Sequence, residues 1–227
     1  MIGVVVPAHN EAFALPSCLT ALQEAAQHAF LYGERVEIVL VLDACTDESE
    51  AVARQYGITV LTTDARNVGV ARATGADHCL GLGARWLAFT DADTCVASDW
   101  LPKQLEQRCD AVCGTVAIRD WGVYGQAMQA HFASSYTDRD GHAHIHGANM
   151  GVSAEAYVRA GGFTSLACSE DVALVEALKT TGATIAWSAS PRVFTSARQD
   201  FRAAGGFGDT LLRIHTQAQT APVCSAE

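Results

Sequence analysis

Apolar and polar positions come in alternating blocks along the first ninety residues, and the blocks predict strands and helices in turn. IGVVVP (2–7) is a β-branched run ended by proline, which indicates a strand, whereas the leucines of residues 13–30 recur at helical spacing. Further near-continuous apolar runs predict more strands. The predicted strands span residues 2–7, 36–42, 57–63 and 85–91, and the predicted helices between them span 13–30, 47–56 and 68–82. Alternation of this kind, with strands buried on both faces, is typical of an α/β protein with a doubly wound, mainly parallel sheet.

The second half of the chain has a more mixed pattern and is expected to complete the same sheet, with one antiparallel strand. Predicted helices follow at 100–108, 123–136, 170–181 and 209–219, and predicted strands at 110–118, 184–189 and 192–197; residues 144–153, rich in small side chains, are expected to form a strand or a bend. No repeat or linker interrupts the pattern. We therefore expect one domain over residues 1–219, followed by a disordered tail at 220–227.

Composition and charge narrow the class of protein. The chain has 227 residues, is 49% hydrophobic and carries a net charge of −10, so it lacks the basic surface of a nucleic-acid binder. No apolar run approaches the roughly 20 residues of a membrane span, and the N-terminus does not resemble a signal peptide. The eight cysteines are scattered without a CxxC motif, which favours reduced thiols. We expect a soluble cytoplasmic protein; its oligomeric state stays open.

FTDADT (89–94) places two aspartates directly behind an apolar strand. Because residues i and i+2 of an extended chain face the same side, the carboxylates of Asp91 and Asp93 would repel each other unless a cation lies between them. Mg²⁺ and Mn²⁺ take one or two carboxylates and complete their shell with phosphate oxygens and water. A turn with two solvated aspartates is the alternative, but the position at a strand end favours a metal and diphosphate site.

The turn PAHNEA (7–12) follows the first strand and lacks the GxGxxG pattern, and no P-loop occurs in the chain. These absences argue against a dinucleotide-dependent oxidoreductase and a P-loop enzyme. Backbone groups of the turn and Glu11 offer contacts for a nucleotide, as does Asp43 at the end of the second strand. The competing interpretation is local: Asn10 and Asp47 cap helices, and Asp43 lies in an ordinary turn.

GHAHIHG (141–147) carries three histidines at alternate positions. His142, His144 and His146 would share one face of a strand. Three interpretations remain open: an exposed strand edge, a pocket lined by His146 alone, or a metal site. The third would suit Zn²⁺ or Ni²⁺ better than the oxygen-preferring cation of an aspartate pair.

Seven segments in order resemble the motifs of glycosyltransferase family 2: VVVPAHNEA, VLDACTD, RNVGVARATGAD, FTDADT, HGANMGVS, AGGF and SEDVAL. The resemblance covers residues 2 to about 190. It implies the GT-A fold, a Rossmann-like three-layer α/β/α sandwich with a mixed, mainly parallel sheet. It also implies a metal-dependent enzyme, using Mn²⁺ or Mg²⁺, that moves a sugar from a nucleoside diphosphate sugar to an acceptor hydroxyl. A UDP-sugar donor and an inverting course are favoured, and the sugar and acceptor stay open.

The resemblance also assigns roles to individual residues. The nucleotide contacts fall on Pro7, Ala8, Glu11, Asp43, Arg72 and Asp91. The metal is expected on Asp93, with Asp91 beside it. The sugar or acceptor pocket falls on His146, Gly147, Ala148 and Asn149. The general base falls on Asp171, with Glu170 orienting the acceptor or the base. Acidic residues also stabilise a first helical turn, and Gly147 also suits close packing, so local interpretations of these residues remain.

The C-terminal region departs from the family pattern. Many relatives have a histidine after the last strands, whereas this chain offers Arg198 and Arg202 and no histidine before His215. Arginine suits a diphosphate through paired hydrogen bonds, and a surface loop is the alternative. Two other functions remain as alternatives to transfer: a non-catalytic nucleotide-sugar-binding protein, and a sugar nucleotidyltransferase, which would normally show a glycine-rich segment after the first strand.

Overall fold

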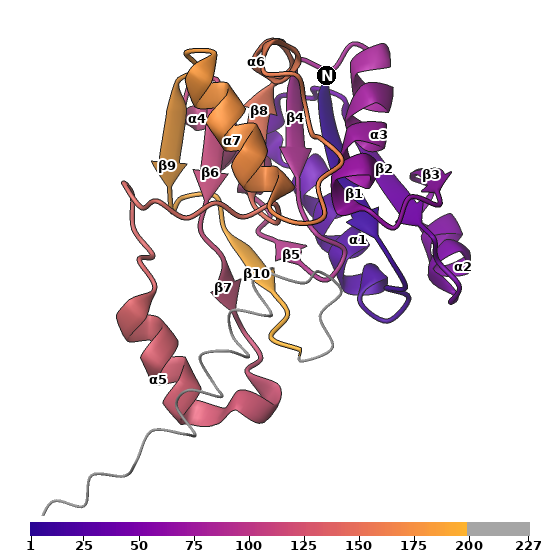
Figure 1. Cartoon of the computed structure of the whole chain (residues 1–227). Helices are drawn as coiled ribbons and strands as arrows, with labels where there is room; N and C mark the ends of the chain where they lie inside the picture. The colour runs from indigo at the N-terminus through magenta and orange to yellow at the C-terminus, as the bar shows by residue number, and fades with distance from the viewer. Residues whose placement is uncertain (199–227) are drawn as a thin grey trace, which may run out of the picture.

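The structure is a computed structural model that describes residues 1–198 (Figure 1). From the N-terminus the chain forms β1 (Ile2–Ala8), α1 (Leu15–Ala26), β2 (Val36–Asp43), α2 (Ser49–Ala53), β3 (Thr59–Thr63), α3 (Val68–Gly81) and β4 (Trp86–Phe89). It continues through β5 (Cys95–Val96), α4 (Trp100–Glu106), β6 (Ala111–Gly114), β7 (Ala117–Ile118), α5 (Gly125–Ser135), β8 (Met150–Ser153), α6 (Ala154–Arg159), α7 (Glu170–Thr180), β9 (Ile185–Ser188) and β10 (Val193–Thr195). Arg202, His215, the predicted helix at 209–219 and the predicted tail at 220–227 lie outside the described residues.

A seven-stranded sheet forms the centre of the fold, in the order β3-β2-β1-β4-β8-β6-β9 (Figure 1). β8 runs antiparallel to both of its neighbours, and the other adjacent pairs are parallel. The mixed, mainly parallel sheet predicted from the sequence is therefore confirmed. β1 lies between β2 and β4 in register, so the carboxyl ends of these three strands meet at one edge.

Helices cover both faces of this sheet, which makes the three-layer sandwich. One core packs α1, α2 and α4 against the sheet, with Leu15, Leu19 and Trp100 fully buried. The other packs α3, α6 and α7, with Leu174 and Leu178 buried. The N-terminal halves of α3 and α7 meet at the edge where β4 ends, since Arg72 of α3 binds both Asp91 and Glu170.

Close packing of α3 on the sheet depends on glycine. A Cβ at Gly75 would lie 2.4 Å from the side chain of Val5, and one at Gly3 would lie 2.6 Å from that of Cys79. These distances are far below van der Waals contact, so larger residues would push the helix away from β1. The site residues on α3 are thereby held close to the strand ends.

The predicted strand at 110–118 is interrupted, which the sequence pattern did not indicate. β6 ends at Gly114, and β7 joins β5 and β10 in a separate three-stranded sheet. The interruption has a local cause: the carbonyl of Thr115 accepts a hydrogen bond from Asn149, and the N–H of Val116 donates to the Tyr136 hydroxyl. Backbone groups that would continue the ladder thus bind side chains instead.

Three other features bear on the predictions. Residues 144–153, expected to form a strand or a bend, contain both, since residues 144–149 are irregular and β8 begins at Met150. The seven cysteines among residues 1–198 are free thiols. No helix in this part of the chain is long and apolar enough to cross a membrane.

Candidate active site

The turn after β1 is held against the loop after β2. Asn10 has a positive φ of 55°, and its side-chain oxygen accepts hydrogen bonds from the N–H groups of Thr46 and Asp47 at 2.7 and 3.3 Å. The prediction that Asn10 caps the following helix is therefore wrong, because the side chain joins two loops. Asp47 accepts hydrogen bonds from the N–H groups of Ser49 and Ala12, but the N-cap residue of α2 is Glu48, so the predicted cap at Asp47 is wrong.

Asp43, at the end of β2, is buried and supports the start of α3. Its two carboxylate oxygens accept hydrogen bonds from the backbone N–H groups of Arg66 and Asn67, at 2.8 and 2.7 Å. Asn67 in turn caps α3 by accepting a hydrogen bond from the N–H of Val70. Contact of Asp43 with a nucleotide base stays a prediction, as it does for Pro7 and Ala8, which are buried at the end of β1.

Arg72 is the centre of a buried charge cluster at this edge. It projects from α3 and is 3% exposed. Its Nη2 donates to Asp91 at 2.6 Å, and its Nη1 donates to Glu170. Burial opposes the charge, but Asp91 and then Glu170 outweigh it and raise the pKa of Arg72. The cluster therefore joins α3, the segment after β4 and the first turn of α7, which are distant in sequence.

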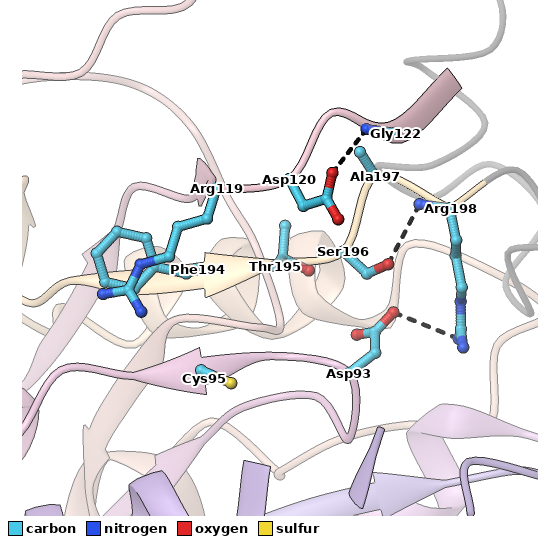
Figure 2. Close-up of a pocket in the computed structure, with 10 residues that line it drawn as sticks. All are labelled: Asp93, Cys95, Arg119, Asp120, Gly122, Phe194, Thr195, Ser196, Ala197 and Arg198. Carbon is cyan, nitrogen blue, oxygen red and sulfur yellow. Dashed lines mark hydrogen bonds and ion pairs between the residues drawn. The ribbon is translucent and has the colours of Figure 1, made fainter. Parts of the chain in front are cut away.

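Asp93 belongs to a second group of charged residues, in which the charges are balanced differently. Arg198 forms two hydrogen bonds to Glu11, and its Nη2 lies 3.3 Å from Asp93 Oδ2 (Figure 2). Burial, and then repulsion by Asp91, raise the pKa of Asp93 to about 6 although Arg198 lowers it. Charged Asp93 is thus incompletely neutralised by the protein.

A cavity of about 550 Å³ opens beside Asp93 (Figure 2). Arg119 lies over the ring of Phe194 on its wall, with the guanidinium carbon 3.4 Å from the ring centroid. Sequence reasoning did not identify these two residues, because they lie 75 positions apart and meet only in the sheet of β5, β10 and β7. Arg198 lines the same cavity, and the structure thereby brings it to the predicted metal ligand.

The donor set at Asp93 fits a hard divalent cation. The oxygens that line it belong to carboxylates, and burial first, then the negative charge of Asp91, raise the pKa of Asp93. Residues 1–198 contain no cluster of three or more His, Cys, Asp or Glu side chains that could hold a metal ion by themselves. With the ligands that residues 1–198 offer, a cation at Asp93 would need phosphate oxygens and water to complete its shell, as Mg²⁺ commonly does.

Asp171 and Glu170 begin α7 and have different surroundings. Asp171 Oδ2 accepts a hydrogen bond from the backbone N–H of Gly147 at 2.9 Å, and the side chain is partly exposed. Glu170 is 6% exposed and pairs with Arg72, so its carboxylate faces the protein. Of the two acids predicted to be catalytic, Asp171 is therefore the one open to a substrate.

The segment GANM (147–150) is tightly packed. A Cβ at Gly147 would lie 2.3 Å from Arg72 Nη2, so only glycine allows the backbone this close to the guanidinium. Ala148 is buried. The side chain of Asn149 donates to the carbonyls of Thr115 and Pro191 and accepts from Trp100. These contacts give Asn149 a structural role, which differs from the predicted contact with a sugar.

The three histidines stack with Tyr136 instead of lining a strand. The His144 and Tyr136 rings are 4.1 Å apart, and His142 and His146 stack on either side of His144. The Tyr136 hydroxyl accepts a hydrogen bond from the N–H of Val116 and forms a second hydrogen bond with His146 Nε2 at 2.9 Å. Burial and the neighbouring imidazoles lower the pKa of His146 to about 3, which keeps it neutral. Tyr136 carried no signal in the sequence.

The architecture is the GT-A fold, and two solved structures share it. TarS 1-349 of S. aureus in complex with UDP-GlcNAc superposes with a TM-score of 0.69 at 14% identity, over 95% of this chain and 65% of that chain. The mannosyltransferase PcManGT of Pyrobaculum calidifontis, in complex with GDP-Man and Mn²⁺, superposes with a TM-score of 0.67 at 20% identity, over 88% of this chain and 57% of that chain.

The chain belongs to glycosyl transferase family 2, whose family model matches residues 3–159. It is 29% identical over 104 residues to the low-salt glycan biosynthesis hexosyltransferase Agl6 of Haloferax volcanii. That match covers 46% of this chain and 24% of Agl6. The chain thus covers less than two thirds of the length of each of these three proteins.

Proposed function

We propose that the chain transfers a sugar from a nucleoside diphosphate sugar to an acceptor hydroxyl, with Mn²⁺ or Mg²⁺ at Asp93. A UDP-linked donor and inversion at the anomeric carbon are part of the proposal. We also propose that residues 1–219 act as one catalytic domain and that the protein works in the cytoplasm. The free thiols among residues 1–198 support this location.

The proposal rests mainly on one observation: Asp91 and Asp171 both lie near the guanidinium of Arg72. Asp91 binds Arg72 directly, and Asp171 is hydrogen-bonded to Gly147, whose backbone lies against the same side chain. The proposed donor site and the proposed base are therefore neighbours. A transfer reaction needs this proximity, because the acceptor hydroxyl must reach the anomeric carbon and the base together.

In the proposed reaction Asp171 accepts the proton of the acceptor hydroxyl as that oxygen attacks the anomeric carbon. The bond from this carbon to the diphosphate oxygen breaks, and the nucleoside diphosphate leaves. Asp93 would hold the divalent cation, which would supply positive charge to the leaving diphosphate. Arg198, beside Asp93, is placed to bind the same diphosphate by its paired donors.

The test is a thermal-shift panel of UDP, GDP, TDP and CDP, each with and without Mn²⁺, followed by measurement of nucleotide release from the corresponding sugar donors. We expect UDP with Mn²⁺ to stabilise the protein most. Asp171→Asn should lower turnover by about 10²–10⁴-fold and leave nucleotide binding intact. The anomeric configuration of the product, read by NMR, tests inversion.

Two results would contradict the proposal in different ways. If none of the nucleotides stabilises the protein, the proposed donor site is wrong. Should nucleotide and Mn²⁺ bind while no donor is turned over and Asp171→Asn changes nothing, the chain is a non-catalytic nucleotide-sugar-binding protein.

A further inference from the structure

Arg72 makes contacts that go beyond holding a nucleotide. Its two terminal nitrogens bind carboxylates from different parts of the chain, Asp91 after β4 and Glu170 in α7. The guanidinium is almost fully buried, and its Nε has no hydrogen-bond partner. Only a planar fork with separate donors serves two carboxylates in this way, which a lysine ammonium on a flexible stem does not reproduce.

Asp171 is held in position from two sides, and both supports rest on Arg72. The first is the helix turn itself, since Asp171 directly follows Glu170, which Arg72 binds. The second is the N–H of Gly147, which donates to Asp171 at 2.9 Å. Gly147 lies so close to Arg72 that a methyl group there would come within 2.3 Å of Nη2. A displaced guanidinium would therefore move both supports.

Arg72 Nη2, the nitrogen that lies closest to Gly147, also binds Asp91. Asp91 is the less buried partner, with its side chain 35% exposed at the proposed donor site. A ligand that pulls on Asp91 therefore acts on Arg72, and through it on Glu170 and Gly147. The path is short and continuous: two ion pairs of Arg72, of which the one with Glu170 is buried, and the close packing of Gly147 against the guanidinium.

We propose that Arg72 is a positioning residue that links donor binding at Asp91 to the placement of the Asp171 carboxylate. The inference rests on the proposed function and deepens it. It differs from the expectation from sequence, in which Arg72 lies near the nucleotide base and Glu170 acts on the acceptor. Here Glu170 is the partner through which Arg72 holds the first turn of α7.

The test must separate positioning from folding, because removing Arg72 leaves Glu170 buried without a partner. We compare Arg72→Met with the double variant Arg72→Met/Glu170→Gln, in which the buried unpaired charge is absent. The double variant should regain most of the melting temperature lost by the single one. Its kcat should stay about 100-fold or more below wild type, with the donor KM raised far less.

Arg72→Lys is the conservative variant, and Arg85→Met is the matched control. Arg85 forms a paired contact to Glu34, at the opposite end of β4 from Asp91. The lysine variant keeps the charge without the fork, so we expect its kcat to stay at least about tenfold below wild type. Arg85→Met should leave kcat within about twofold.

A second readout does not need turnover. Hydrogen exchange at the amides of Gly147 and residues 171–173 is measured with and without UDP and Mn²⁺. In wild type the ligand should slow exchange at these amides, and in the folded double variant it should not.

The proposal is overturned if the double variant or Arg72→Lys has the kcat of wild type, or if ligand protection of α7 survives in the double variant. A wild type that binds UDP without turning over any donor refutes the transfer reaction, and the exchange experiment then still decides the coupling. If UDP and Mn²⁺ do not bind at all, the donor site and the coupling fail together.

Discussion

Asp91 and Asp93 stand two positions apart in one motif, and the fold gives them opposite surroundings. Asp91 has a buried arginine at 2.6 Å, and that arginine is itself balanced by Glu170. Asp93 faces the negative charge of Asp91 and of Glu11, and Arg198 approaches it only to 3.3 Å. The first carboxylate is part of a completed ion-pair cluster, whereas the second carries charge that the protein does not fully neutralise.

The difference indicates how one short motif serves both the fold and a ligand. A carboxylate with a buried partner holds elements together, as Asp91 does for α3 and the end of β4. A carboxylate whose charged form is disfavoured in the protein is typical of a functional site, because a ligand can supply the missing charge. Such a residue lowers the stability of the protein without its ligand, which is a common property of binding sites.

The largest expected effect is on activity. Asp93→Asn keeps the shape of the side chain and removes its charge, so kcat/KM should fall about 100-fold or more. Asp120→Asn is the matched control, since Asp120 lines the same cavity and accepts from the N–H of Gly122. Its kcat/KM should stay within about threefold. Equal losses in both variants would mean that Asp93 has no special role.

The next largest effect is expected on the stability of the protein when Asp91 is substituted. Asp91→Asn replaces the charged acceptor of a buried guanidinium, so the free energy of unfolding should fall by about 1–3 kcal/mol. Urea denaturation without nucleotide or metal measures this. An unchanged midpoint would show that Arg72 does not depend on Asp91, and the contrast between the two aspartates would be lost.

A smaller effect of opposite sign is expected for Asp93→Asn in the same denaturation experiment. The pKa of Asp93 is raised from 3.8 to about 6 in the fold, so ionisation of Asp93 destabilises the protein increasingly as the pH rises from about 4 to 6, and by a constant amount above that. At pH 7 the variant should be more stable than wild type by about 1–2 kcal/mol, after allowing for partial solvent screening.

The size of that effect depends on pH in a defined way. Near pH 4 wild-type Asp93 is largely protonated in the fold, so the charge is absent in both proteins and the gain should disappear. A gain that persists at pH 4, or a loss at pH 7, would contradict the assignment of Asp93 as a poorly neutralised carboxylate.

The smallest effect is expected for an ion pair in solvent. Arg159 and Glu155 pair one turn apart on α6, at 3.2 Å, with 39% and 89% of their side chains exposed. Arg159→Ala should change the free energy of unfolding by less than about 1 kcal/mol in urea. A loss as large as that of Asp91→Asn would mean that burial does not distinguish the Arg72 cluster.

Much of the fold follows from local patterns. The β-branched runs before Ala8 and Asp43 predict β1 and β2, and the cap at Asn67 marks the start of α3, because these signals depend on neighbouring residues. The break between β6 and β7 did not appear in the pattern. It depends on Asn149 and Tyr136, which reach the strand from 20 or more positions away.

The candidate site divides in the same way. Asp93 and Asp171 stand in recognisable motifs, and the structure gives both of them partly exposed positions at the same edge. The partnership of Arg72 with Glu170 spans 98 positions, and no local pattern carries it. The stacking of His144 on Tyr136 likewise contradicts a strand with three aligned histidines.

By itself the sequence determined the alternation of strands and helices, the acidic motif after β4 and the family to which the chain belongs. These depend on residue types at fixed spacing, which can be read along the chain. The tertiary structure decided which carboxylate acquired a buried arginine and which did not. Charge balance depends on distance and burial in three dimensions, so two aspartates that are equivalent in the motif became a structural contact and a candidate ligand site.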